Sequence, residues 1–127
     1  MNLENLMKLS QNHKKQISLI LVIFFVLTLV IAGLDKFFNI LSNWVAYLNP
    51  KLLPFPIAPI LFMRLVGIFE ILLGLSLFTH WRKTTGYIVA IWFILISVNL
   101  LSMNLYFIAF KDILRAMGAV LLAKLNE

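Results

Sequence analysis

The chain has 127 residues, of which 62% are hydrophobic and 13% are charged, whereas soluble domains are about 45–50% apolar. A soluble domain of this length cannot bury so many apolar side chains, so the composition indicates a membrane protein. The chain has no cysteine, which excludes disulfides and cysteine-ligated metals. The net charge is +6, but the basic residues are scattered between apolar runs, which argues against nucleic acid as a partner.

Four apolar segments follow one another along the chain. The first, residues 17–34, carries no charged side chain and is about 27 Å long as a helix, close to the hydrocarbon thickness of a bilayer. It is longer than the apolar part of a signal peptide and lacks a small-residue cleavage site, which indicates a retained span. The sequence therefore predicts an all-α fold, a single domain over residues 1–127 that forms a four-transmembrane-helix bundle with spans at 17–34, 57–79, 86–103 and 105–125.

The longest connection between the predicted spans contains an amphipathic segment, residues 37–49. Its apolar side chains recur at helical spacing, at Phe37, Ile40, Leu41, Trp44, Val45 and Leu48. This pattern predicts an amphipathic helix, which either anchors the chain on the membrane surface or folds back as a lid. Prolines at positions 50, 54, 56 and 59 then interrupt helical structure before the second span.

The distribution of lysine and arginine predicts the orientation in the membrane. One side of the predicted bundle carries Lys8, Lys14, Lys15, Arg82, Lys83 and Lys124, and the other carries Lys36 and Lys51. Because cytoplasmic loops are enriched in basic residues, both termini are expected in the cytoplasm. The expected location is the inner (plasma) membrane, which the chain crosses several times.

Several ionisable side chains lie inside the predicted spans at similar depths. Counted from the outer ends of the spans, Arg64, Lys111 and Asp112 lie about 10 Å deep, Arg115 about 15 Å and Glu70 about 20 Å. An unpaired charge within a bilayer is costly, so such groups face the bundle interior and pair. Depth therefore predicts two ion pairs between helices, Arg64 with Asp112 and Glu70 with Arg115.

Two further features surround these pairs. Lys111 shares a helix face with Arg115, where the two cations repel unless an acid or an anionic ligand lies between them, and Asp35 is a candidate acid. Gly67 and Gly74 lie on the same helix face as Glu70. Small residues there let a neighbouring helix approach closely, which would bring a long arginine side chain to Glu70.

Together these side chains form a candidate binding site in the outer half of the bundle, comprising Asp35, Lys36, Arg64, Glu70, Asn99, Lys111, Asp112 and Arg115. Its four cations exceed its three carboxylates, which suits a small oxyanion or the carbonyl of a quinone. Intramembrane charges mark functional sites by default, although buried ion pairs can also serve only to fix helix register. His13 and His80 are expected in solvent without zinc-ligand spacing, so no metal site is predicted.

Three stretches resemble the DoxX-like family of small four-helix membrane proteins: "GLDKFF" (33–38), "EILLGLSLFTHWRKTTGY" (70–87) and "FKDILRAMGAVLLAKL" (110–125). In that family a glycine and a basic-aromatic step end the first helix. A glutamate on the second helix precedes a basic turn, and a basic-acidic step lies in the last helix. Lys111 stands where members more often have arginine, which unlike lysine offers a planar bidentate fork. The resemblance implies a four-helix bundle linked to membrane redox complexes, since the family is named after a subunit of a thiosulfate:quinone oxidoreductase.

The predicted function is an accessory or quinone- or small-oxyanion-binding subunit of a membrane redox system, in contact with the lipid bilayer and a redox partner protein. Arg64, Lys111 and Arg115 would bind the ligand, and Glu70 and Asp112 would hold those cations in place. The sequence has no self-contained catalytic or cofactor motif, so catalytic residues stay unassigned and a quinone is the one cofactor considered. The alternatives are a small homo-oligomeric transporter and a purely structural membrane scaffold.

Overall fold

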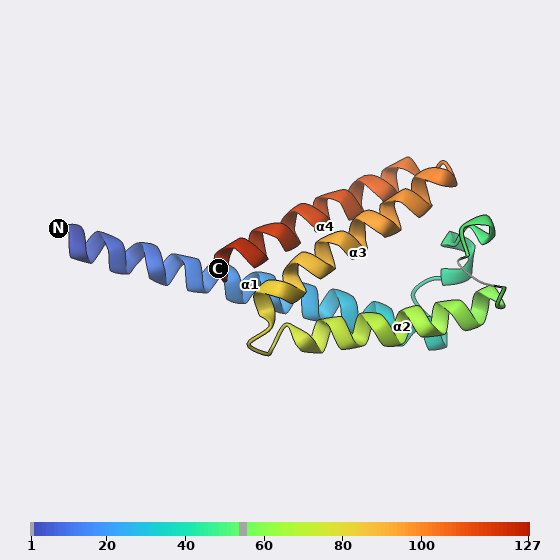
Figure 1. The fold of residues 1–127 in the computed structure, drawn as a ribbon, viewed down its shortest axis with the longest axis horizontal. Coiled ribbons are helices and arrows are strands. Elements are labelled where there is room, and N and C mark those ends of the chain that lie inside the picture. The colour runs from blue at the N-terminus through green and yellow to red at the C-terminus, as the bar shows by residue number, and fades with distance from the viewer. Residues whose placement is uncertain (1, 54–55) are drawn as a thin grey trace.

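The computed structural model describes residues 2–53 and 56–127. The fold is all-α, with four long helices and two short 3₁₀ helices in the connection between the first two (Figure 1). The helices are α1 (Leu3–Phe38), η1 (Trp44–Tyr47), η2 (Pro50–Leu52), α2 (Pro59–Ser76), α3 (Arg82–Ser102) and α4 (Tyr106–Leu125). In the described residues, α1, α2 and α3 are long and apolar enough to cross a membrane, which suggests a multi-pass membrane protein.

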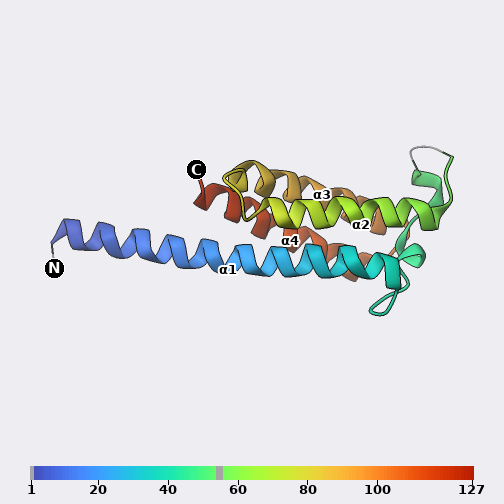
Figure 2. The same ribbon diagram turned by 90° about the horizontal axis from the view of Figure 1, so that it is seen from below.

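The four helices form two hairpins that pack against each other. α2 runs back along α1, and α4 runs back along α3, as the two views in Figures 1 and 2 show. The turn between α2 and α3 lies at the same end of the bundle as the C-terminus, and the α1–α2 connection lies at the opposite end (Figure 2). The hairpins meet at a core that includes Val22, Phe25, Leu29, Leu73, Leu77, Val89, Phe93, Ala119 and Leu122.

The helices of each hairpin approach closely because small residues lie where they cross. A Cβ atom added to Gly33 would lie 2.6 Å from the carbonyl oxygen of Gly67, and one added to Gly67 would lie equally close to the carbonyl oxygen of Gly33. Gly74 packs in the same way against Val30, and Gly86 of α3 packs against Ala123 of α4. The predicted close approach of a helix to the Gly67–Gly74 face is confirmed, and that helix is α1.

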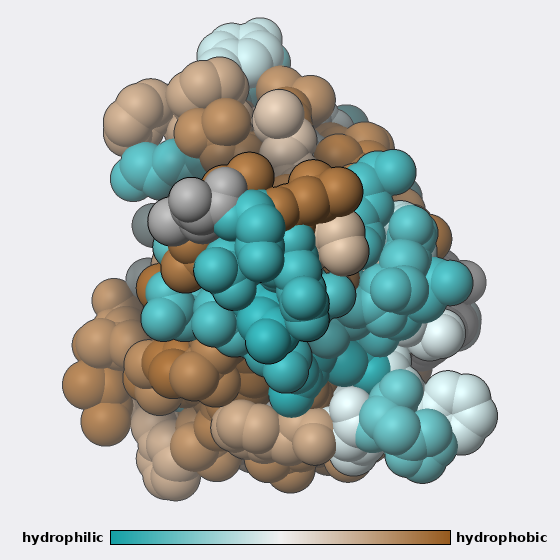
Figure 3. All heavy atoms as spheres, turned by 90° about the vertical axis from the view of Figure 1, so that its left-hand side faces the viewer, coloured by the Kyte–Doolittle hydropathy of each residue, from teal (hydrophilic) through white to brown (hydrophobic). Residues whose placement is uncertain are grey.

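α1 is longer than the predicted span at 17–34. It has 36 residues and a length of about 54 Å, against about 30 Å for the hydrocarbon core of a bilayer. Its N-terminal turns, residues 3–16, project beyond the other helices (Figures 1 and 2) and are exposed on all sides. Seen from that end, hydrophilic side chains gather around the projecting turns, with hydrophobic surface beside them (Figure 3).

The amphipathic helix expected over residues 37–49 does not form. α1 continues to Phe38 and ends at Asn39, whose φ of 52° is left-handed. The Asp35 carboxylate then accepts the backbone N–H groups of Ile40 and Leu41, both at 2.9 Å, so the chain turns back instead of continuing as helix. Only Trp44–Tyr47 of the segment is helical, as 3₁₀ helix. Pro54, one of the prolines expected to interrupt helical structure, lies outside the described residues.

Candidate functional site

A buried ion pair joins the two helices of the first hairpin. The Lys36 ammonium of α1 contacts the Glu70 carboxylate of α2, and the two side chains are only 6% and 4% exposed. The glycine crossing one turn away brings these positions together. Two tryptophans complete the surroundings: the Lys36 ammonium lies 3.9 Å from the ring centroid of Trp44, and the Trp92 indole N–H donates to Glu70 at 3.4 Å.

Within the described part of the α1–α2 connection, Trp44 covers this ion pair. The Trp44 indole N–H donates to the Asp35 carboxylate at 2.8 Å, so the same ring contacts both Asp35 and Lys36. Asn99 of α3 binds a later part of the connection through two hydrogen bonds. Its amide N–H donates to the carbonyl oxygen of Tyr47 at 2.6 Å, and its oxygen accepts the backbone N–H of Asn49 at 2.9 Å.

The second ion pair lies within α4. Arg115 donates to Asp112, one helical turn earlier, at 2.6 Å. Asp112 is buried, whereas the Arg115 side chain is 36% exposed. Asp112 lies within electrostatic range of both Lys36 and Glu70. The two ion pairs therefore form one polar cluster, which we define as Asp35, Lys36, Glu70, Asp112 and Arg115.

The ion pairs predicted from depth are wrong. Glu70 pairs with Lys36 rather than Arg115, and Asp112 pairs with Arg115 rather than Arg64. Arg64 is exposed, because it precedes Glu70 by six residues and so lies about 120° away around the helix. Lys111 is exposed as well, with its ammonium 4.6 Å from the ring centroid of Phe107. The predicted role of Asp35 as a partner of Lys111 is replaced by its hydrogen bonds to the connection.

The charge balance of the cluster also differs from the prediction. Arg64 lies outside the cluster, and exposed Lys111 acts on it only as a charge near Asp112. Three carboxylates thus face two cations within the cluster, and the positive excess expected for anion binding is absent. Asp35 is satisfied by three N–H donors, and the other four side chains form two neutral pairs. The cluster therefore keeps the negative charge of Asp35, and it is better suited to a neutral polar ligand than to an oxyanion.

A shallow groove of about 290 Å³ runs along the outer side of α1 and reaches Trp44, which contacts Lys36 and Asp35 of the cluster. It is lined by Leu27, Thr28, Ile31, Ala32, Leu41, Ser42 and Trp44. Sequence reasoning placed Trp44 in the predicted amphipathic helix and missed both its contact with the cluster and the part played by Trp92. The sequence pattern does not predict either tryptophan contact, because both contacts depend on how the helices pack.

Within residues 2–53 and 56–127, no three histidine, aspartate or glutamate side chains are grouped to hold a metal ion. His80 stacks on Trp81 in the α2–α3 turn, and His13 is exposed on the projecting part of α1. The projecting part of α1 and the α2–α3 turn lie at the end of the bundle away from the α1–α2 connection (Figure 1). Comparisons of the chain with protein-family models, characterised proteins and solved structures give no match.

Proposed function

We propose that all four helices span the inner membrane and that both termini lie in the cytoplasm. α4 has 20 residues, enough for about 30 Å, and it packs along α3, a candidate span. Its charged side chains are compatible with a span because Asp112 and Arg115 pair and Lys124 lies in the last turn. Lysine and arginine gather at the end of the bundle that carries both the C-terminus and the α2–α3 turn.

Single-cysteine labelling tests this orientation, and the chain contains no native cysteine to interfere. Asn12→Cys and Lys83→Cys are expected to react with an impermeant maleimide only after the cells are opened. Lys51→Cys is expected to react in intact cells. Labelling of Lys51→Cys and Lys83→Cys from the same side would contradict the four-span topology.

We further propose that the protein is a quinone-binding accessory subunit of a membrane redox system, as its likeness to the DoxX-like family implies. The observation that supports this proposal is the buried Lys36–Glu70 ion pair, covered by Trp44 at the end of a groove that opens to the outside of the bundle. Intramembrane charges are expensive to maintain, and they are candidates for functional sites by default.

A quinone fits this arrangement better than an oxyanion for two reasons. The apolar groove beside α1 suits an isoprenoid tail, while a cluster without excess positive charge suits an uncharged head with carbonyl oxygens. Arg115 is the cation with free donors and partial exposure, and it would hydrogen-bond a carbonyl. Glu70 and Asp112 would exchange the protons that accompany quinone reduction. Electrons would reach the quinone from the cofactor of a partner protein.

Quinone retention after gentle purification tests the proposal. Wild type is expected to carry extractable quinone, detected by native mass spectrometry and chromatography of the extract. Arg115→Ala and Trp44→Leu are expected to lose it. Arg64→Ala and Trp81→Leu are matched controls, because each removes the same type of side chain from an exposed position, and both should retain it. Equal retention in all five proteins, or none in folded wild type, would contradict quinone binding at this cluster.

One observation favours a structural scaffold as the second candidate function. Each charged side chain of the cluster has a partner inside the same chain, so the pairs can serve only to fix helix packing. A scaffold predicts that Arg115→Ala lowers stability without changing any bound quinone. The quinone content of the purified protein therefore distinguishes the two candidate functions, whereas its melting temperature does not.

A further inference from the structure

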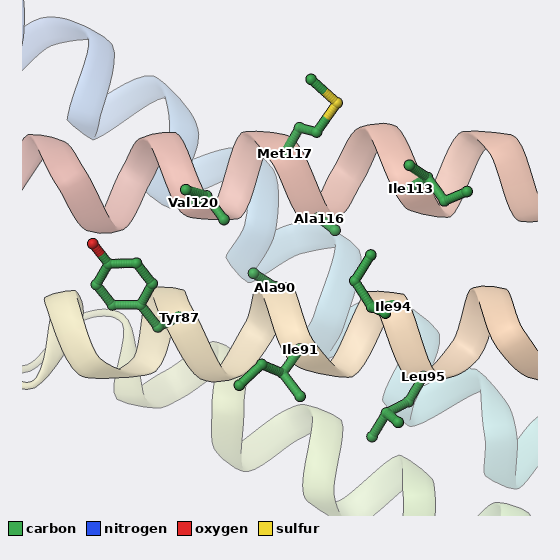
Figure 4. Close-up of a pocket in the computed structure, with 9 residues that line it drawn as sticks. All are labelled: Tyr87, Ala90, Ile91, Ile94, Leu95, Ile113, Ala116, Met117 and Val120. Carbon is green, nitrogen blue, oxygen red and sulfur yellow. The ribbon is translucent and has the colours of Figure 1, made fainter.

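A second groove lies between α3 and α4 on the outer surface of the bundle, and no residue of the polar cluster lines it. Its volume is about 380 Å³, and the nine residues that line it are Tyr87, Ala90, Ile91, Ile94, Leu95, Ile113, Ala116, Met117 and Val120 (Figure 4). Ala90 and Ala116 face each other across its floor, where their small side chains leave the space that the larger residues border. From Tyr87 to Leu95 the groove follows α3 for about 12 Å.

One end of this groove is polar. The Tyr87 hydroxyl, at the end near Val120 (Figure 4), donates to the Glu127 carboxylate at 2.5 Å. Lys83 lies one turn before Tyr87 on α3, and Lys124 lies one turn after Val120 on α4. Both lysines are exposed and lie within electrostatic range of Glu127. Two ammonium groups and one carboxylate thus leave a positive charge at the polar end, and the rest of the groove is apolar.

We propose that this groove holds an acyl chain of an anionic phospholipid, whose headgroup binds Lys83 and Lys124. The lysines lie at the end of the bundle with the α2–α3 turn and the C-terminus, where the headgroup layer of one leaflet would meet the protein. Basic side chains at that level attract anionic headgroups. The apolar groove below them accommodates the chain, so a lipid with a negative headgroup satisfies both ends of the site at once.

Charge favours a lipid over a second copy of this chain as the occupant. A symmetric dimer formed through the groove, with both copies in the same orientation, would bring Lys83 and Lys124 of one protomer to the level of the same lysines in the other. Like charges at an interface oppose association. An anionic headgroup between the lysines removes that repulsion instead of adding to it.

Lipid retention measured by native mass spectrometry tests the site. The wild-type protein is released from nanodiscs that contain equal amounts of phosphatidylglycerol and phosphatidylethanolamine. It is expected to keep one phosphatidylglycerol molecule in preference to phosphatidylethanolamine. Lys83→Gln with Lys124→Gln should lower that preference about 25-fold, the product of two contributions of about fivefold each. Lys14→Gln with Lys15→Gln, which removes two lysines from the projecting part of α1, should leave it unchanged.

A second variant fills the groove without changing its charge. Met117 is exposed, so Met117→Trp is expected to fold normally by circular dichroism, block the groove and abolish lipid retention. Equal retention of the two lipids by wild type, or an unchanged preference in the double lysine variant, would overturn the proposal. A wild-type dimer that Met117→Trp dissociates would also overturn it, because the groove would then be an interface between two copies.

Discussion

Removing one partner of the Lys36–Glu70 ion pair is expected to destabilise the protein strongly. Both side chains are almost fully buried, so Lys36→Met leaves the Glu70 carboxylate with only the Trp92 indole N–H at 3.4 Å. An uncompensated buried charge of this kind costs about 3–5 kcal/mol. Glu70→Gln leaves the Lys36 ammonium beside the Trp44 ring, which stabilises a cation by about 0.5–2 kcal/mol, so its cost is expected to be smaller.

The double variant separates the ion pair from the rest of the packing. Lys36→Met with Glu70→Gln removes both charges and is expected to cost less than the sum of the single variants, with a coupling energy of about 2–3 kcal/mol. The assay is reversible unfolding in mixed micelles, followed by circular dichroism. Lys51→Met is the matched control, because Lys51 is exposed in η2, and it should change stability by less than about 0.5 kcal/mol.

Additive effects of the two substitutions would refute the reasoning, because additivity means that the two groups do not interact in the folded protein. Single variants as stable as Lys51→Met would refute it too. In that case water or lipid headgroups would have to reach the pair, and the tight crossing of α1 and α2 around it would not exist as described.

Three other outcomes are expected. Gly67→Ala places a methyl group against the carbonyl oxygen of Gly33, 2.6 Å away, and should lower stability by about 1–3 kcal/mol in the same unfolding assay. Asn99→Ala removes the two hydrogen bonds from Asn99 to the α1–α2 connection, so the backbone amides of the connection should exchange hydrogen faster while those of α1 do not. The Tyr87 hydroxyl holds the pKa of Glu127 below its usual range. Stabilisation by that carboxylate is therefore present above its unfolded pKa and lost as pH falls through the lowered value, and Tyr87→Phe should raise this pKa in an NMR titration.

The helical content, and the face of α2 that meets a neighbouring helix, could be predicted from the sequence. Long apolar runs predict helices by composition alone, and the spacing of Gly67, Glu70 and Gly74 correctly identifies one face that meets a neighbouring helix. The predicted depth placed Asp112 at a level similar to that of the other intramembrane charges, and Asp112 is indeed buried near Glu70. These features depend on the position of a residue along a single helix.

The partners within the site could not be predicted, because they depend on which helices are adjacent and how each is rotated. Depth gives no rotation, so exposed Arg64 was assigned to the interior. Depth also gives no adjacency, so the partner of Glu70 was sought on the last helix when it lies on α1 as Lys36. The segment 37–49 has helical periodicity, but the Asp35 carboxylate accepts the N–H groups that begin the turn, and that contact overrides the periodic pattern.

The placement of the ion pairs has a mechanical consequence. Lys36 and Glu70 both belong to the first hairpin, and Asp112 and Arg115 both belong to the second, so no salt bridge among the described residues joins the two halves. The halves are instead joined by uncharged donors: the Trp92 indole N–H of α3 donates to the Glu70 carboxylate of α2, and Asn99 of α3 binds the α1–α2 connection. A rotation of one hairpin against the other would therefore break these hydrogen bonds and leave both ion pairs intact.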